Sequence, residues 1–144
     1  MSERASSPCT CFLLRRAARQ VSQVYDHALA GAGLGVNQYS LLRHARTPLS
    51  LGELAARLGM DRTTLNRNLQ PLLRDGLIED ARGEDPRQRV LRITGAGRER
   101  LARARPLWRK AQQRIDALLG GQARERLHAT LDALDAALAQ ERQA

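Results

Sequence analysis

Residues 49–73 read LSLGELAARLGMDRTTLNRNLQPLL, and this stretch decides the fold because two short helices with a tight turn between them fit it. Ser50 stands three residues before Glu53, which is the spacing of a capping box and predicts the start of a helix. Gly59 then breaks that helix, and Asp61 is a suitable N-cap for the next one. We therefore predict a helix-turn-helix over this stretch.

The second helix of this pair has an apolar face and a polar face. Its leucines recur with the three and four spacing of a buried stripe, and the face opposite them carries no acidic residue. In a helix-turn-helix the second helix lies in the major groove, where Arg, Asn, Gln and Thr side chains can pair with base edges. The alternative is an ordinary solvated face. We predict DNA contacts from Arg62, Thr63, Asn66, Arg67 and Gln70.

A basic hairpin is expected after the helix-turn-helix. Residues 77–80 and 89–94 have the pattern of short strands, and the polar segment 81–88 separates them. Asp85 stands close enough to Arg87 to pair with it and hold the tip in shape. The alternative is a solvated turn with weak surface ion pairs. Contacts with phosphate or the minor groove are predicted from Arg82, Arg87 and Arg89.

Long amphipathic stripes flank this region on both sides. Apolar residues keep a three and four spacing over 14–28, 101–118 and 127–138. These stripes are too long for one small lobe to cover, and an exposed apolar stripe normally marks an interface. We therefore predict a homodimer. The alternative is that the two terminal helices fold onto each other within one chain.

The charge balance favours nucleic acid as the partner. The chain has 24 Lys and Arg residues against 15 Asp and Glu, a formal net charge of +9 that attracts polyanions. Aromatic residues make up only 3%, which argues against a membrane-surface helix, and no stretch approaches the roughly 18 apolar residues of a membrane span. We expect a cytoplasmic protein without a membrane partner.

No motif for catalysis stands out in the chain. We find no glycine-rich phosphate loop, no nucleophile elbow and no clustered histidine and carboxylate pair. We therefore expect no enzyme, no cofactor and no metal. Charge alone also supplies affinity for any DNA, so a non-specific architectural DNA-binding protein is the alternative function.

The segment MDRTTLNRNLQPLLRDGLI (60–78) leading into DPRQRVLRIT (85–94), with two helices before it and two after it, resembles the MarR family of bacterial regulators. The resemblance implies a mainly α fold with a small β wing, in which residues 36–94 form a winged helix-turn-helix lobe. Residues 1–35 would then be an N-terminal dimerisation helix, and residues 95–144 the C-terminal dimerisation helices.

The resemblance also implies a function. A dimer would bind a pseudo-palindromic operator in double-stranded DNA, with the recognition helix in the major groove and Arg87 in the minor groove. Repression would be relieved by a small anionic or aromatic ligand. The family's pocket lies between the dimer helices and the lobe, where Tyr39, Arg43 and His44 would contribute, although so few aromatics argue against a stacking cage.

Two thiols stand at the start of the first predicted helix. Amide dipoles at the start of the helix and nearby arginines can make Cys9 or Cys11 reactive, so an oxidant is a second candidate signal. The alternative is a pair of unreactive thiols packed at the base of the dimer. We expect any oxidised bridge to join two subunits. The sequence thus predicts a sequence-specific regulator, a repressor released by a small ligand or an oxidant.

Overall fold

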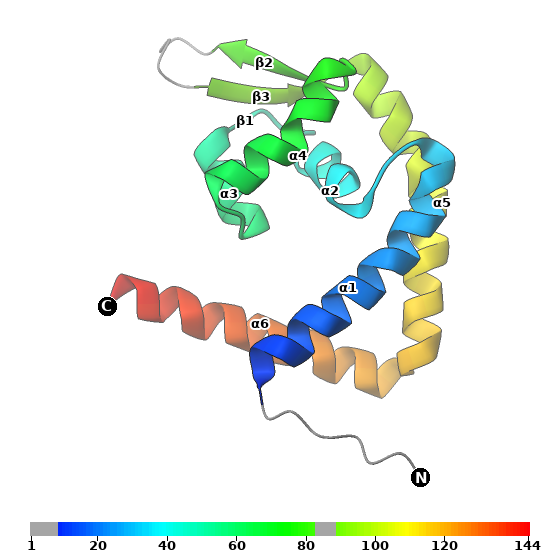
Figure 1. Ribbon diagram of the computed structural model, residues 1–144, viewed down its shortest axis with the longest axis vertical. Helices are drawn as coiled ribbons and strands as arrows, with labels where there is room; N and C mark the ends of the chain where they lie inside the picture. Colours follow the sequence, from blue (N-terminus) through cyan, green and yellow to red (C-terminus); the bar gives the residue numbers. More distant parts are fainter. Residues whose placement is uncertain (1–8, 83–88) are drawn as a thin grey trace.

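The computed structural model describes residues 9–82 and 89–144, which form a winged lobe attached to a frame of long helices (Figure 1). The predicted mainly helical fold with a small β wing is confirmed. No helix in the described part of the chain is long and apolar enough to cross a membrane. The elements are α1 (Thr10–Leu29), η1 (Ala30–Ala32), α2 (Val36–His44), β1 (Leu49–Ser50), α3 (Leu51–Leu58), α4 (Arg62–Arg74), β2 (Ile78–Arg82), β3 (Arg89–Ile93), α5 (Gly95–Leu119) and α6 (Gly121–Gln143).

The wing belongs to a three-stranded antiparallel sheet in the order β1-β3-β2. Strand β3 pairs along its length with β2, and its Leu91 lies opposite Leu49 of β1. The two hairpin strands were predicted, whereas β1 was not. A strand of two residues is too short for an alternating pattern, and only its pairing with β3 defines it.

The helix-turn-helix is held by local bonds at the predicted residues. Ser50 Oγ accepts a hydrogen bond from the backbone N of Glu53 at 3.1 Å, which starts α3. Gly59 ends α3 with φ +62°, a left-handed conformation that other residues rarely adopt. Asp61 then caps α4. The prediction of two helices joined by a tight turn is therefore confirmed.

Apolar side chains of the helices and of the sheet form the core of the lobe. Apart from Tyr25 and Tyr39, no side chain with a polar or charged group is buried among the side chains described, in residues 9–81 and 89–144. Burial of one large apolar side chain stabilises the fold by roughly 1.5 to 3 kcal/mol, so this core fixes the orientation of the helices around it. The largest fully buried side chains are Leu29, Leu41, Leu42, Leu54, Leu65, Leu69, Leu72, Ile78, Leu91 and Ile93.

Helices α1, α5 and α6 form the frame. Helix α1 packs along α5, and α6 turns back from the far end of α5 (Figure 1). A chain of polar contacts joins the three helices: the Tyr25 hydroxyl donates to Gln112 Oε1 at 2.6 Å, Gln112 Nε2 donates to Asp116 Oδ1 at 2.9 Å, and Arg124 Nη1 donates to Asp116 Oδ2 at 3.2 Å. Burial, and then the charge of Asp116, raise the pKa of Tyr25, so its hydroxyl stays protonated as a donor.

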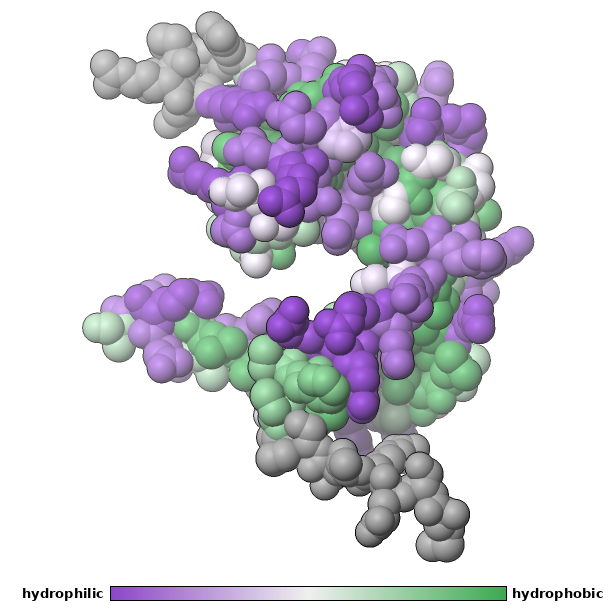
Figure 2. Space-filling model, viewed as in Figure 1, coloured by the Kyte–Doolittle hydropathy of each residue, from purple (hydrophilic) through white to green (hydrophobic). Residues whose placement is uncertain are grey.

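The frame exposes much of its apolar surface. Helix α6 has no buried residue, and its leucine row is 37 to 42% exposed. Figure 2 shows hydrophobic surface over α6, the start of α1 and the far part of α5, whereas the lobe is mainly hydrophilic on this face. The alternative that the terminal helices bury their stripes against each other within one chain therefore fails for α6, whereas α1 and α5 do bury part of their stripes against each other. The row consists of Leu127, Leu131, Leu134 and Leu138.

Candidate nucleic-acid interface

Helix α4 begins at Arg62 because Asp61 caps its first turn. Asp61 Oδ1 accepts from the backbone N of Thr64 at 2.8 Å, and Oδ2 accepts from Thr64 Oγ1 at 2.9 Å. The bond from the backbone N of Thr64 makes the larger contribution and the bond from Thr64 Oγ1 the next, and together they hold the pKa of the Asp61 carboxyl below its ordinary value. The cap therefore stays ionised at neutral pH and fixes the turn that carries Arg62 and Thr63.

The five side chains predicted to contact DNA share the outer face of α4. The leucines of α4 are buried on the opposite face, so packing in the core decides which side points outward. Four of the five are exposed, and Asn66 is partly buried. Side chains on one face of a recognition helix can reach base edges together. The exposed four are Arg62, Thr63, Arg67 and Gln70.

Pro71 lies inside α4 without ending it. A proline inside a helix removes one backbone hydrogen bond and can bend the helix. The sequence alone therefore did not decide whether the outer face of α4 continues past Asn68. The helix continues to Arg74, and Leu72 is buried in the core. Gln70 therefore lies on the same helix as the other outward side chains.

The wing contacts the recognition helix through Arg89. Its Nη1 donates to Asn66 Oδ1 at 3.2 Å, and its Nε donates to Asp80 Oδ2 at 2.5 Å. Asp80 lies opposite Leu91, so it is the diagonal neighbour of Arg89 on the same face of the hairpin. Sequence reasoning gave Asn66 and Arg89 separate contacts with DNA and gave Asp80 no role. Strand register and the packing of α4 bring the three together.

The predicted tip of the hairpin, residues 83–88, lies outside the described residues. The predicted pair of Asp85 and Arg87 falls there, and the side chain of Arg82 is likewise not described, so these three assignments stay sequence predictions. On the described part of the wing, Arg92 forms a second ion pair with Glu79, its direct partner across the two strands. Arg89 and Arg92 are three residues apart, and they therefore lie on opposite faces of the strand.

Tyr39 and Arg43, which were predicted to contribute to an effector pocket, pack on Trp108 of α5. The Tyr39 ring is 4% exposed and stacks on the indole with centroids 5.9 Å apart and planes at 14°. The Arg43 guanidinium lies 5.5 Å from the centroid of the same indole. His44 Nδ1 lies 2.7 Å from the carbonyl oxygen of Ser40. Tyr39 and Arg43 thus contribute to a contact between the lobe and the frame.

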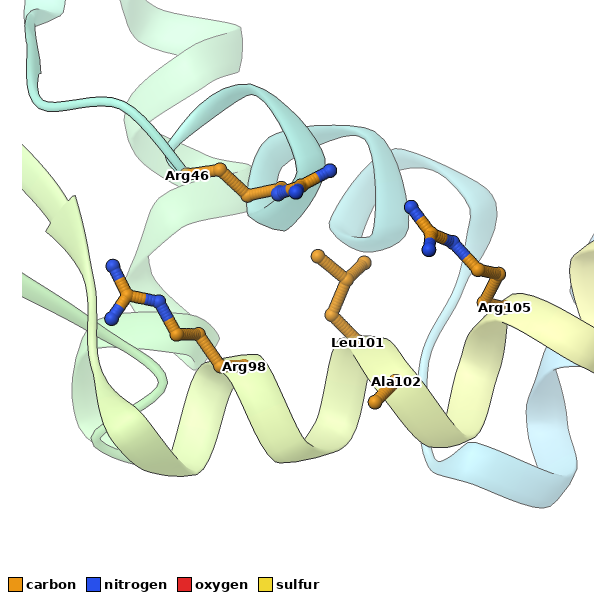
Figure 3. Close-up of a pocket in the computed structure, with 5 residues that line it drawn as sticks. All are labelled: Arg46, Arg98, Leu101, Ala102 and Arg105. Carbon is orange, nitrogen blue, oxygen red and sulfur yellow. The ribbon is translucent and has the colours of Figure 1, made fainter.

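A cavity of about 230 Å³ opens between the segment after α2 and the first half of α5 (Figure 3). Arg46 reaches across from that segment, and Leu101 points into the space beneath it (Figure 3). No acidic side chain is among the described residues that line the cavity, which suits an anion with an apolar body. Sequence reasoning missed this cavity, although the spacing of two arginines seven apart on α5 was a signal. The lining residues are Arg46, Arg98, Leu101, Ala102 and Arg105.

Both cysteines lie at the start of α1, as predicted. Cys9 is the N-cap, and its Sγ accepts from the backbone N of Phe12 at 3.5 Å. Cys11 lies in the first turn, and both cysteines are exposed in the single chain. A small oxidant in solution can therefore reach both positions.

Comparisons with known proteins extend over nearly the whole chain. A helix-turn-helix domain family matches residues 39–81. The transcriptional regulator MosR of M. tuberculosis, solved in complex with DNA, is 40% identical, with a TM-score of 0.78 over 90% of this chain and 98% of that chain. The transcriptional repressor CouR, solved with a 23-mer DNA duplex, is 29% identical, with a TM-score of 0.82 over 94% of this chain and 98% of that chain. No curated protein matches the chain.

A more distant likeness supports the fold alone. A mutant of MarR from E. coli, solved with operator DNA, is 19% identical, with a TM-score of 0.78 over 85% of this chain and 90% of that chain. The likeness to MosR, by contrast, combines 40% identity with coverage of 90% of this chain, so it extends beyond the winged lobe to the long helices that flank it. The chain belongs to the MarR family of winged helix-turn-helix transcriptional regulators, and it is not an enzyme.

Proposed function

We propose that this regulator is a homodimeric, sequence-specific repressor that binds a pseudo-palindromic operator in double-stranded DNA. The observation that carries this proposal is the outer face of α4, where five side chains able to read base edges lie together and one of them is bonded to the wing. MosR and CouR have both been solved with DNA, and CouR is described as a repressor. Both likenesses support the proposal.

A selection from genomic DNA fragments tests sequence specificity directly. The purified protein is incubated with the fragments at about 150 mM salt, where non-specific phosphate contacts are partly screened. We expect recovery of one inverted repeat that binds about a thousandfold more tightly than random DNA. Recovery of random fragments with no shared motif would instead support the architectural alternative.

Replacement of Arg67 by alanine tests direct readout by α4. Arg67 is exposed on the outer face, and an arginine that pairs with a guanine edge contributes roughly 1 to 3 kcal/mol. We expect a loss of that size in operator affinity and a relaxed preference at one base pair, measured by fluorescence anisotropy on a panel of operator variants. Arg74→Ala, at the end of the same helix beside Asp75, is the matched control. An unchanged base profile for Arg67→Ala contradicts the proposed role.

The exposed apolar stripes support the homodimer. The leucine row of α6 and the apolar start of α1 lie on the same part of the surface (Figure 2). A second copy of the chain is the partner we propose for this surface, with residues 1–35 and 95–144 as the dimerisation region and residues 36–94 as the DNA-binding lobe. Two-fold symmetry then places two half-sites about 10 base pairs apart, or a multiple of that spacing.

The arginine-lined cavity is the effector site that we propose. Arg46 follows Ala45, whose carbonyl oxygen accepts from the backbone N of Ile93 at 3.0 Å, so the cavity wall is bonded to the wing strand β3. An anion that draws Arg46 towards Arg98 would move this bond and shift the wing. CouR, at 28% identity, has been solved with p-coumaroyl-CoA. The proposed ligand here is an organic anion with an apolar body.

The exposed thiols provide the oxidant-sensitive route that we propose beside the ligand. Cys9 caps α1 and Cys11 lies in its first turn; α1 packs along α5, and α5 continues from the wing. Oxidation of either sulfur adds bulk and polarity at the first turn of α1, next to the exposed apolar residues assigned to the dimer. The two routes thus act on different ends of the same frame.

One titration separates the two release routes. The protein bound to its operator is treated with 2-naphthoate or with hydrogen peroxide, and release is followed by fluorescence anisotropy. We expect the Arg98→Gln, Arg105→Gln double variant to need at least about a hundredfold more naphthoate, because it loses two charged contacts that each contribute about 1.5 to 3 kcal/mol, and about 1.4 kcal/mol corresponds to tenfold. The Cys9→Ser, Cys11→Ser double variant should resist peroxide. The arginine variant must still respond to peroxide, and the cysteine variant must still respond to naphthoate. A variant that is released normally by both compounds refutes the site that its substitutions were designed to remove.

A further inference from the structure

The bond between Arg89 and Asn66 fixes the direction of the Asn66 amide. A guanidinium has only donor groups, so the amide atom that faces it must be the oxygen Oδ1, which accepts from Arg89 Nη1 at 3.2 Å. The amide nitrogen Nδ2, a donor, therefore points away from Arg89. This assignment follows from the chemistry of the two groups and needs no observed hydrogen.

Arg89 is itself held in place by a second contact. Its Nε donates to Asp80 Oδ2, and the Arg89 side chain is 35% exposed against 38% for Asp80. The planar guanidinium of Arg89 thus uses one nitrogen to bind Asp80 and another to bind Asn66. A lysine has a single ammonium group on a flexible stem and cannot reproduce this arrangement. An exposed ion pair adds little stability by itself, so its main consequence here is geometric.

We propose that Arg89 is a positioning residue that makes Asn66 enter the major groove as a hydrogen-bond donor and so selects guanine at one position of each half-site. The inference rests on the proposed function, which places α4 in that groove. Guanine presents two acceptors there, N7 and O6, to the Nδ2 group of Asn66. The usual bidentate contact of asparagine with adenine requires the amide nitrogen and oxygen to face the base together, and the bond from Oδ1 to Arg89 opposes this arrangement.

The test compares base preferences of the parent and of Arg89→Lys in a selection from a randomised DNA duplex pool. Lysine keeps the positive charge, so a general phosphate contact is preserved, but its single ammonium pairs with Asp80 and releases Asn66. We expect the parent to prefer guanine at the Asn66 position. We expect Arg89→Lys to shift the ratio of guanine to adenine there by about tenfold towards adenine and to leave the other positions unchanged. Asp80→Asn should produce a smaller shift in the same direction.

Two controls isolate the positioning role. Arg92→Lys alters an arginine of the same strand in the same kind of cross-strand ion pair, but on the opposite face, so its base profile should match the parent. In an Asn66→Ala background, Arg89→Lys should cause no further change at that base pair, because the two substitutions act through one contact. Thermal unfolding of each variant checks that the lobe remains folded.

The outcomes separate this inference from the proposed function. A selected motif that Arg89→Lys leaves unchanged overturns the inference alone, as does a shift that persists in the Asn66→Ala background. A parent preference for adenine at that position also overturns it. Failure of the pool to yield any motif overturns both the inference and the proposed sequence specificity.

Discussion

Gly97→Ala is expected to destabilise the protein by about 3 kcal/mol, since overpacking costs roughly 1 to 3 kcal/mol and a lost backbone hydrogen bond adds about 1. A Cβ at this position would lie 2.1 Å from the carbonyl oxygen of Leu77 and 2.7 Å from Cγ1 of Ile93. That carbonyl accepts from the backbone N of Thr94 at 3.0 Å, so it cannot move away without weakening the bond between the wing and α5. The free energy of unfolding is measured by urea denaturation, with Trp108, the single tryptophan, as the fluorescent probe.

Gly95→Ala is the matched control for this prediction. Gly95 lies in the same first turn of α5, and a Cβ there meets no atom within 4 Å. Because alanine favours helix over glycine by up to about 1 kcal/mol, this variant should be as stable as the parent or slightly more stable. Equal stability of the two alanine variants would contradict the close approach of α5 to the wing. Gly97→Ala should also weaken operator binding, because the same contact orients the wing.

Leu131→Glu is expected to convert the proposed homodimer into monomers and to raise its dissociation constant by about a thousandfold or more. The substitution places two carboxylates in one apolar interface, and burial of each ion costs several kcal/mol, whereas a thousandfold change requires roughly 4 kcal/mol. Leu131 is 37% exposed in the single chain, so the fold of each chain should tolerate the change. Sedimentation equilibrium measures the association, and a gel-shift titration measures the loss of operator affinity, which follows because two linked lobes bind two half-sites.

Ala136→Glu is the control for the interface. Ala136 is exposed and lies five residues after Leu131, on the opposite side of α6. Its replacement by glutamate introduces the same charge into the same helix. This variant should remain dimeric and bind the operator like the parent. A Leu131→Glu protein that stays dimeric at micromolar concentration would show that the leucine row does not form the interface.

The helix-turn-helix could be predicted from sequence because each of its boundaries depends on neighbours within a few residues. The bond from the backbone N of Glu53 to Ser50 Oγ, the left-handed turn at Gly59 and the Asp61 cap each join atoms at most four residues apart. The leucine spacing of α4 also identified its outer face. The candidate readout residues followed from that face, and α4 does extend past Asn68 to Arg74.

The contacts of the site with the rest of the protein could not be predicted in this way. Asn66 and Arg89 are 23 residues apart, and they meet only because the register of β2 and β3 places Arg89 beside α4. The stacking of Tyr39 on Trp108 depends on the packing of α2 against α5. An exposed arginine carries no pattern that indicates a partner, so neither Arg89 nor the cavity residue Arg46 could be assigned a neighbour from sequence.

The sequence by itself determined the order of the six helices and the two hairpin strands, the two faces of α4, the positive charge and the apolar stripes that indicate a dimer, because composition and short-range periodicity encode these properties. The tertiary structure decided which side chains meet: Arg89 with Asn66, Tyr39 with Trp108, and Arg46 with the arginines of α5. It also left the leucine row of α6 uncovered within one chain. The physical reason is that such contacts depend on strand register and helix packing, which the whole core fixes together.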